Sequence, residues 1–152
     1  INKYDFEKII IFFTYSSFEN YENNKALDDT FLSFTNELKK LDKEKIRIVG
    51  QPVIWNDSIK RIIYREYRLD SNFDEYTNKF LNQNIFSYEQ KMKTFSENEE
   101  LKYFSIIGIL CLESSCKTVV KDGNINYGLF VDKIHMSQYT VNFLAKSFLK
   151  LS

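Results

Sequence analysis

Glycine and proline are scarce in this sequence, and it has no long hydrophobic run. Only 4 glycines and 1 proline occur among 152 residues. No glycine-rich loop follows any apolar segment, which argues against a site that cradles the phosphates of a nucleotide. The longest apolar run, residues 9–13, is far shorter than the roughly 18 residues that a membrane-spanning helix requires.

The sequence also lacks an excess of charge of either sign. Its 21 basic and 21 acidic residues cancel, and acidic residues interrupt the short basic runs. A strong field that attracts nucleic acid is therefore not expected, and nucleic acid is not among the predicted partners. Hydrophobic residues nevertheless make up 43% of the chain, which is enough for a packed core and argues against disorder.

Length and uniform composition favour one domain. No repeat and no Gly/Ser-rich linker divides the sequence, so residues 1–152 are predicted to form a single domain. The chain begins with Ile1 rather than Met, and we expect it to be a piece of a larger or processed protein.

Hydrophobic periodicity predicts alternating strands and helices. The predicted strands are residues 9–13, 46–51 and 103–112, and the predicted helices are residues 23–42, 58–65, 72–83, 86–98 and 137–150. The continuous run at 9–13 is typical of a central strand that is covered on both faces. This order predicts an α/β fold, a three-layer sandwich with a mostly parallel sheet flanked by helices.

The single histidine, His135, follows an aspartate by three residues. In a turn before a helix, the Asp132 carboxylate can accept a hydrogen bond from one ring nitrogen of His135, which leaves the other nitrogen as a general base. The alternative is an ordinary helix-entry loop with a surface histidine. The spacing alone is a weak motif, and Ser137 is predicted to be the N-cap of the last helix rather than a nucleophile.

The two cysteines, Cys111 and Cys116, leave three alternatives open. They can close a small disulfide loop, remain two buried free thiols, or bind a metal ion together with His135. A disulfide would imply an oxidising compartment. Neither a metal ion nor a cofactor is predicted.

The segment FVDKIHMSQYTVNFLAKSFL, residues 130–149, resembles the terminal Asp-x-x-His block of SGNH hydrolase-like domains. The similarity is greatest to the domains fused to membrane-bound O-acyltransferases that modify bacterial surface polysaccharides, including lipopolysaccharide. Three more segments are similar to that subfamily, in the same order: KYDFEKIIIFFTYSSF, KIRIVGQPVIW and ILCLESSC. In the first segment Tyr15 stands where a tryptophan is usual, and the third resembles a paired-cysteine loop.

The resemblance implies an SGNH/flavodoxin-like fold in which His135 is the general base and Asp132 orients it. It also implies that the two cysteines are paired. Tyr15, Ser16 and Trp55 are predicted to line the substrate-binding cleft, and packing in the interior is the alternative for Trp55.

SGNH domains carry their nucleophile in a Gly-Asp-Ser block on the first strand, and no Gly-Asp-Ser triplet occurs in this sequence. We therefore expect an N-terminally truncated fragment that lacks the first strand and is inactive by itself. Ser16 and Ser17 are weak replacements, because no neighbouring glycine permits a strained nucleophile turn. An open sheet edge would favour a homo-oligomer.

The predicted function is the C-terminal part of a periplasmic or other extracytoplasmic O-acetyltransferase or esterase domain that acts on bacterial surface glycans by Ser-His-Asp acyl transfer. Its predicted partners are an acyl donor, a glycan acceptor and a membrane-embedded acyltransferase domain of the parent chain, which would tether it to the inner membrane. The alternative is a non-catalytic α/β module that binds a glycan or a protein.

Overall fold

The structure is a computed structural model that describes residues 7–12, 33–66 and 77–150. Its elements follow one another as β1 (Ile9–Phe12), η2 (Lys43–Lys45), β2 (Ile46–Val49), α2 (Ile59–Glu66), α4 (Asn84–Asn98), β3 (Lys102–Phe104), α5 (Ile106–Leu110), β4 (Cys111–Leu112), β5 (Ser115–Cys116), β6 (Val119–Asp122), β7 (Ile125–Gly128) and α6 (Gln138–Lys150). They fall into two compact units. The first unit comprises the described parts of residues 1–51 and 88–104, and the second those of 52–87 and 105–152. The single-domain interpretation stays a prediction.

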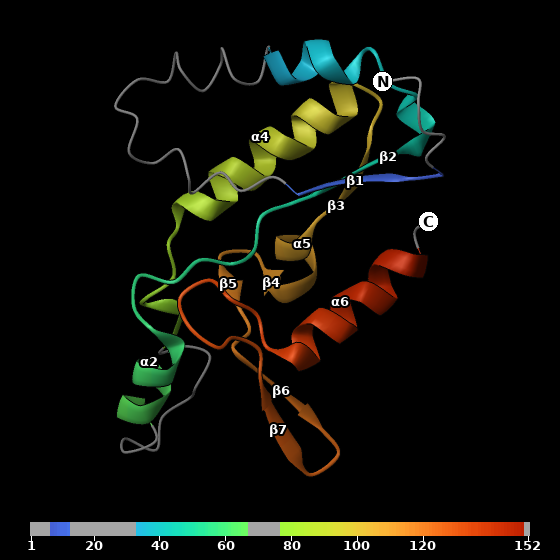
Figure 1. The fold of residues 1–152 in the computed structure, drawn as a ribbon. Helices are drawn as coiled ribbons and strands as arrows, with labels where there is room; N and C mark the ends of the chain where they lie inside the picture. The colour runs from blue at the N-terminus through green and yellow to red at the C-terminus, as the bar shows by residue number, and fades with distance from the viewer. Residues whose placement is uncertain (1–6, 13–32, 67–76, 151–152) are drawn as a thin grey trace. The chain divides into compact units, whose positions relative to one another are not determined.

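The first unit contains a three-stranded parallel sheet in the order β1-β2-β3 (Figure 1). Ile9 of β1 is aligned with Ile46 of β2, and Val49 of β2 with Phe104 of β3. Parallel neighbours require crossover connections, which usually contain helices. The predicted α/β fold with a parallel sheet flanked by helices is therefore confirmed.

Helices cover one face of this sheet with a compact hydrophobic core. Ile46 and Ile48 of β2 are both 0% exposed and pack in one cluster with Leu38, Met92 and Leu101. Leu38 lies in the helical residues 33–38 and Met92 lies in α4. In the described part of the helix predicted at residues 23–42, Leu38 is thus buried, and Phe34 and Leu41 are partly buried against the same core. Residues 23–32 of that prediction lie outside the described residues.

The strand predicted to be central lies at an edge among the described strands. β1 pairs with β2 alone in this part of the chain, and its residues alternate between half-buried and exposed, with Phe12 72% exposed. All four residues of β2 are buried instead. A continuous apolar run does not distinguish these two positions, because the position of a strand depends on which other strands pair with it.

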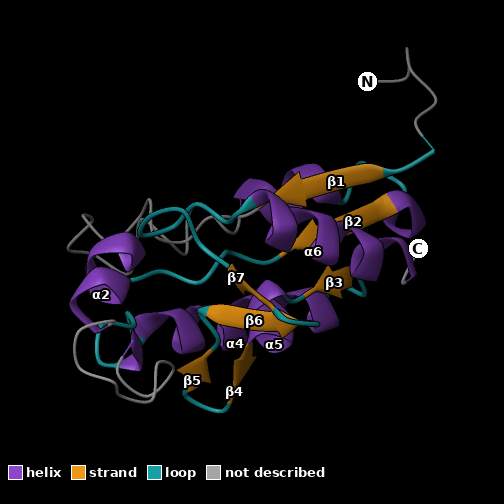
Figure 2. Cartoon of the chain, turned by 90° about the horizontal axis from the view of Figure 1, so that it is seen from below, coloured by secondary structure: helices purple, strands orange, loops and turns teal. Residues whose placement is uncertain are grey.

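The second unit contains α2, α5, two short antiparallel hairpins and α6 (Figure 2). The predicted helices at 58–65 and 137–150 correspond to α2 and α6. Ser137 caps α6 as predicted, because its Oγ accepts a hydrogen bond from the Thr140 backbone N–H at 3.3 Å. None of the helices in the described residues is long and apolar enough to cross a membrane.

The third predicted strand, residues 103–112, is wrong over half its length. After the short β3, residues Ile106–Leu110 form the helix α5. Ser105 explains the change, because its Oγ accepts a hydrogen bond from the Gly108 backbone N–H at 2.6 Å and caps the helix. A Cβ at Gly108 would come within 2.7 Å of this hydroxyl oxygen. The Ser-x-x-Gly spacing was the missed signal, and it overrides the β-branched composition.

The loop predicted after residue 112 contains two hairpins. Cys111 pairs with Cys116 in the first hairpin, β4–β5. In the second hairpin, β6–β7, the turn follows Asp122, and Gly123 in that turn has φ +60°. Such short hairpins carry too few residues for a clear alternating pattern.

Gly50 stands immediately after β2, at a point where the chain comes very close to a tyrosine. Its N–H donates to the Phe104 carbonyl at 2.9 Å, and a Cβ at this position would clash with the Tyr103 hydroxyl. That hydroxyl donates to Glu89 Oε2 at 2.7 Å. Burial, together with the nearby Glu89 carboxylate, raises the pKa of Tyr103 well above its ordinary value, so the tyrosine acts as a neutral donor.

We predict that Gly50→Ala lowers the free energy of unfolding by about 1–3 kcal/mol, because the added methyl group overpacks this contact. The loss should be smaller in a Tyr103→Phe background, which lacks the clashing hydroxyl. Chemical denaturation followed by circular dichroism measures both values. Gly128→Ala is the matched control, since a Cβ there meets no atom within 4 Å. An equal effect of the two alanine substitutions would contradict the steric explanation.

Candidate functional site

The site loop, residues 130–136, is closed on itself between β7 and α6. Phe130 and Met136 form an isolated antiparallel bridge, and the Val131 N–H donates to the His135 carbonyl at 2.7 Å. Below them, the Leu129 carbonyl accepts from the Ser137 N–H at 2.9 Å and from the Thr140 hydroxyl at 2.7 Å. Hydrogen bonds therefore hold both ends of the loop together, next to the capped start of α6.

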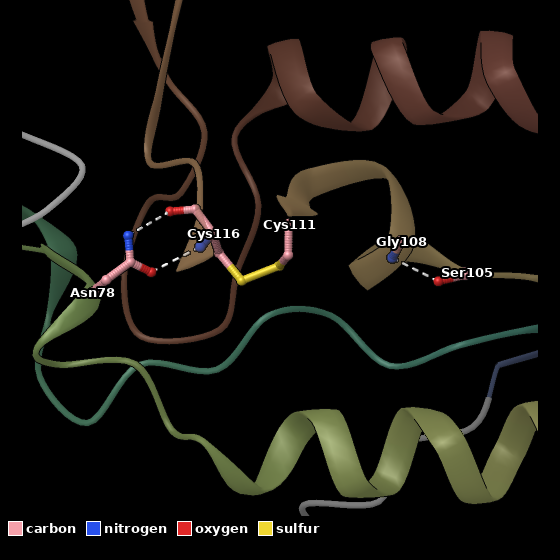
Figure 3. The surroundings of a disulfide bond; sticks show 5 residues. All are labelled: Asn78, Ser105, Gly108, Cys111 and Cys116. Carbon is pink, nitrogen blue, oxygen red and sulfur yellow. Dashed lines mark hydrogen bonds between the residues drawn. A yellow bond between two sulfur atoms is a disulfide. The ribbon is translucent and has the colours of Figure 1, made fainter. Parts of the chain in front are cut away.

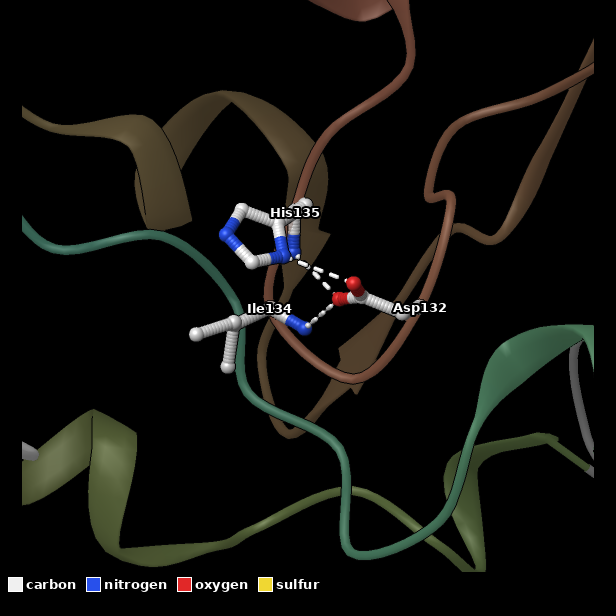
Figure 4. Close-up of polar contacts among 3 residues, drawn as sticks. All are labelled: Asp132, Ile134 and His135. Carbon is white, nitrogen blue, oxygen red and sulfur yellow. Dashed lines mark hydrogen bonds and ion pairs between the residues drawn. The ribbon is translucent and has the colours of Figure 1, made fainter.

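Within the site loop, both oxygens of the Asp132 carboxylate are hydrogen-bonded (Figure 4). Oδ1 accepts from the backbone N–H groups of Ile134 at 2.9 Å and His135 at 2.8 Å. Oδ2 lies 2.7 Å from Nδ1 of the His135 ring. The aspartate thus shapes the turn with one oxygen and orients the imidazole with the other.

These contacts favour the ionised form of Asp132. The backbone N–H of His135, then that of Ile134, then the His135 ring lower the pKa of Asp132 from 3.8 to about 2. A carboxylate that is charged at neutral pH accepts the Nδ1 proton and stabilises an imidazolium. In the neutral ring, Nε2 then carries the free lone pair and can act as a base.

The His135 ring is open to solvent on the side away from the aspartate. Its side chain is 73% exposed, and Nε2 points away from the carboxylate (Figure 4). Among the described residues, no serine or threonine hydroxyl is hydrogen-bonded to this ring. The Asp132–His135 pair therefore has the geometry that a charge-relay pair requires, and Nε2 of the ring is accessible to solvent.

A profile of the family described as "SGNH domain (fused to AT3 domains)" matches residues 2–150. The chain belongs to this SGNH family. A search of curated proteins gives no match to the chain.

One solved structure is similar to this SGNH domain: the periplasmic domain of the lipopolysaccharide acetyltransferase of Salmonella ser. Paratyphi A. The TM-score is 0.71 at 18% sequence identity, and the match covers 95% of the present chain. At this identity the likeness shows a shared fold. The chain spans 56% of the length of that solved chain.

Three residues were predicted to line the substrate cleft of the SGNH domain. Tyr15 and Ser16, and likewise the alternative nucleophile Ser17, lie outside the described residues. Trp55 is 1% exposed, so its ring packs in the interior and offers no free face to a sugar in this structure. Its environment fits the packing alternative.

The two cysteines of the SGNH domain, Cys111 and Cys116, are joined by a disulfide, which is the first of the three alternatives (Figure 3). With their sulfur atoms bonded, they offer no thiolate to a metal ion. In the described part of the chain, no group of three His, Cys, Asp or Glu side chains could hold one. The disulfide therefore excludes a metal site formed by two cysteine thiolates and His135.

The side chain of Asn78 fixes the disulfide hairpin and was not singled out from the sequence. Its Oδ1 accepts from the Cys116 N–H at 2.7 Å, and its Nδ2 donates to the Cys116 carbonyl at 3.2 Å (Figure 3). This amide mimics a neighbouring strand. No local pattern reveals such a contact, because 38 residues separate its partners.

We predict that the turn in the site loop depends on pH through Asp132. Because the folded-state pKa of Asp132 is depressed, the ionised carboxylate stabilises the turn fully above pH 3.8. This stabilisation is lost as the pH falls through about 2. NMR chemical shifts of the Ile134 and His135 amides should titrate with a midpoint near 2. The Leu144 amide reports whether α6 remains folded, and Asp132→Asn should abolish the titration. A midpoint at the ordinary value would contradict the hydrogen-bonded arrangement.

Proposed function

We propose that this SGNH domain supplies the base and its orienting acid for acyl transfer, most plainly O-acetyl transfer, to hydroxyl groups of a bacterial surface glycan. The observation that carries the proposal is the contact of Asp132 Oδ2 with His135 Nδ1 at 2.7 Å. Membership of the AT3-fused family and the fold shared with the periplasmic domain of a lipopolysaccharide acetyltransferase support it.

The reaction begins with a serine hydroxyl placed at Nε2 of His135. As the serine oxygen bonds to the acyl carbonyl carbon, Nε2 takes the hydroxyl proton and the carbonyl electron pair moves to its oxygen. Collapse of this tetrahedral intermediate expels the leaving group of the donor, which takes the proton from Nε2. The products of this half are an acyl-serine and a neutral histidine.

In the second half of the reaction, Nε2 of His135 again accepts a proton and then returns it. A sugar hydroxyl gives its proton to Nε2 and attacks the acyl-serine, and the departing serine oxygen recovers that proton. Water in place of the sugar would give hydrolysis. Throughout both halves Asp132 stays ionised and pairs with the transient imidazolium, in keeping with its pKa of about 2.

The nucleophile in this proposal is a serine of a Gly-Asp-Ser block that is not among the 152 residues. The sequence contains no such triplet, and the exposed Nε2 leaves room for a hydroxyl to approach. We propose that a membrane-embedded acyltransferase domain of the same gene product delivers the acyl group, and that the SGNH domain works on the periplasmic side. The Cys111–Cys116 disulfide is in keeping with an oxidising compartment.

In the complete gene product, His135→Ala should lower kcat/KM for acetyl transfer or acetyl-ester hydrolysis by about 10³-fold or more, because it removes the general base. Asp132→Asn should cost about 10²–10⁴-fold, because it misorients the ring and cannot stabilise the imidazolium. Steady-state kinetics with a chromogenic acetyl ester measure both. Lys146→Ala, an exposed substitution on α6, is the control and should leave the rate unchanged.

Two results would overturn the proposal. Full activity of both site variants would favour a non-catalytic module that binds a glycan or a protein. Robust hydrolysis by the 152-residue chain alone, lost in Ser16→Ala or Ser17→Ala, would place the nucleophile within the chain.

A further inference from the structure

We infer that Trp55 is a positioning residue for His135: it holds the site loop at two points and thereby sets where the imidazole lies. As a role in catalysis this rests on the proposed function, whereas the effect of Trp55 on the loop can be tested by itself. The inference replaces the substrate-lining role expected from the sequence with a role inside the second unit.

The first point is at the tip of the site loop. The Trp55 backbone N–H donates to the carbonyl of Lys133 at 2.9 Å. Lys133 lies between Asp132 and His135, so this bond fixes the loop at the centre of the dyad. In Figure 4 the segment that follows β2, drawn in blue-green, passes beside the loop.

The second point is at the base of the site loop. The rings of Trp55 and Phe130 meet edge to face, with centroids 5.6 Å apart and an interplanar angle of 73°. Phe130 is 5% exposed, and the loop begins at its bridge to Met136. An edge-to-face pair of this kind adds attraction beyond the burial of its surface.

Trp55 is itself held by its neighbours, so it can act as an anchor. On the side opposite Lys133, Trp55 forms an antiparallel bridge with Leu81. The flanking residues complete this pairing: the Asn56 N–H donates to the Phe80 carbonyl at 2.7 Å, and the Asn82 N–H donates to the Ile54 carbonyl at 3.0 Å. The short segment 54–56 is therefore paired with residues 80–82 on one side and with the site loop on the other.

The indole N–H of Trp55 suggests a clean conservative variant. Its Nε1 is buried and has no hydrogen-bond partner among the described residues. Removing an unsatisfied buried donor costs little, whereas removing the ring opens a cavity. Both Trp55→Phe and Trp55→Ala keep the backbone N–H, but only Trp55→Phe keeps an aromatic ring next to Phe130. Trp55→Phe should therefore preserve positioning that Trp55→Ala loses.

NMR of the 152-residue chain tests the effect on the loop directly. In Trp55→Ala we expect the pKa of Asp132 to rise from about 2 toward 3.8, and the Ile134 and His135 amides to lose their protection from exchange. Trp55→Phe should keep both properties. Met92→Ala is the matched control, because it truncates a buried side chain of the first unit and should leave Asp132 unchanged.

Phe130→Leu provides a second, milder variant in case Trp55→Ala does not fold. It removes the edge-to-face contact and should shift the Asp132 pKa in the same direction by a smaller amount. An unchanged Asp132 pKa with unchanged amide protection, in a folded Trp55→Ala or Phe130→Leu protein, would overturn the inference.

Kinetics of the complete gene product separate this inference from the proposed function. Trp55→Ala should lower kcat by roughly 10- to 100-fold with little change in KM, because a displaced base affects the chemical step. Trp55→Phe should restore most of the rate. If His135→Ala leaves activity intact, the proposed function fails, and the NMR titration still decides whether Trp55 positions the loop.

Discussion

The candidate site depends on the carboxylate of Asp132, which shapes the turn of the site loop and orients the ring of His135. Asp132 accepts from two backbone N–H groups with one oxygen and contacts Nδ1 of His135 with the other. Hydrogen bonds to a charged acceptor are stronger than neutral ones. Here they hold the exposed part of the loop, whereas Phe130 at its start is buried against Trp55. The same ionised group is the one that acyl transfer requires beside an imidazolium, so local structure and proposed chemistry have a common cause.

The exposed histidine belongs to a loop whose ends are held by buried residues and hydrogen bonds. Leu129, directly before the site loop, and Phe130, its first residue, are buried, and the Leu129 carbonyl receives two hydrogen bonds from the start of α6. The backbone N–H of Trp55 also donates a hydrogen bond to the Lys133 carbonyl at the tip of the loop. In the proposed function, an imidazole that is 73% exposed leaves room for the serine and the acyl donor, which would complete the site and exclude water during acyl transfer.

The sequence predicted those features that depend on local patterns. Helix α2, the cap at Ser137 and the Asp132–His135 pair each follow from spacing over a few residues. The parallel sheet follows from the alternating order of the predicted strands and helices. The helix at Ile106–Leu110 was missed because its cap competed with a β-branched composition. Three features depend on residues far away in the chain: the burial of Trp55, the hydrogen bonds of Asn78 to Cys116, and the edge position of β1 among the described strands. Contacts of this range leave no periodic trace.

The central claim is that His135 activates a serine outside these 152 residues. The most direct measurement is to label the complete gene product with a fluorophosphonate probe and to map the modified serine by peptide mass spectrometry. We predict a single modified serine, in a Gly-Asp-Ser block that precedes Ile1, with a labelling rate that falls by about 10²-fold or more in His135→Ala. Modification at Ser16 or Ser17, or labelling that is unaffected by His135→Ala, would contradict the claim.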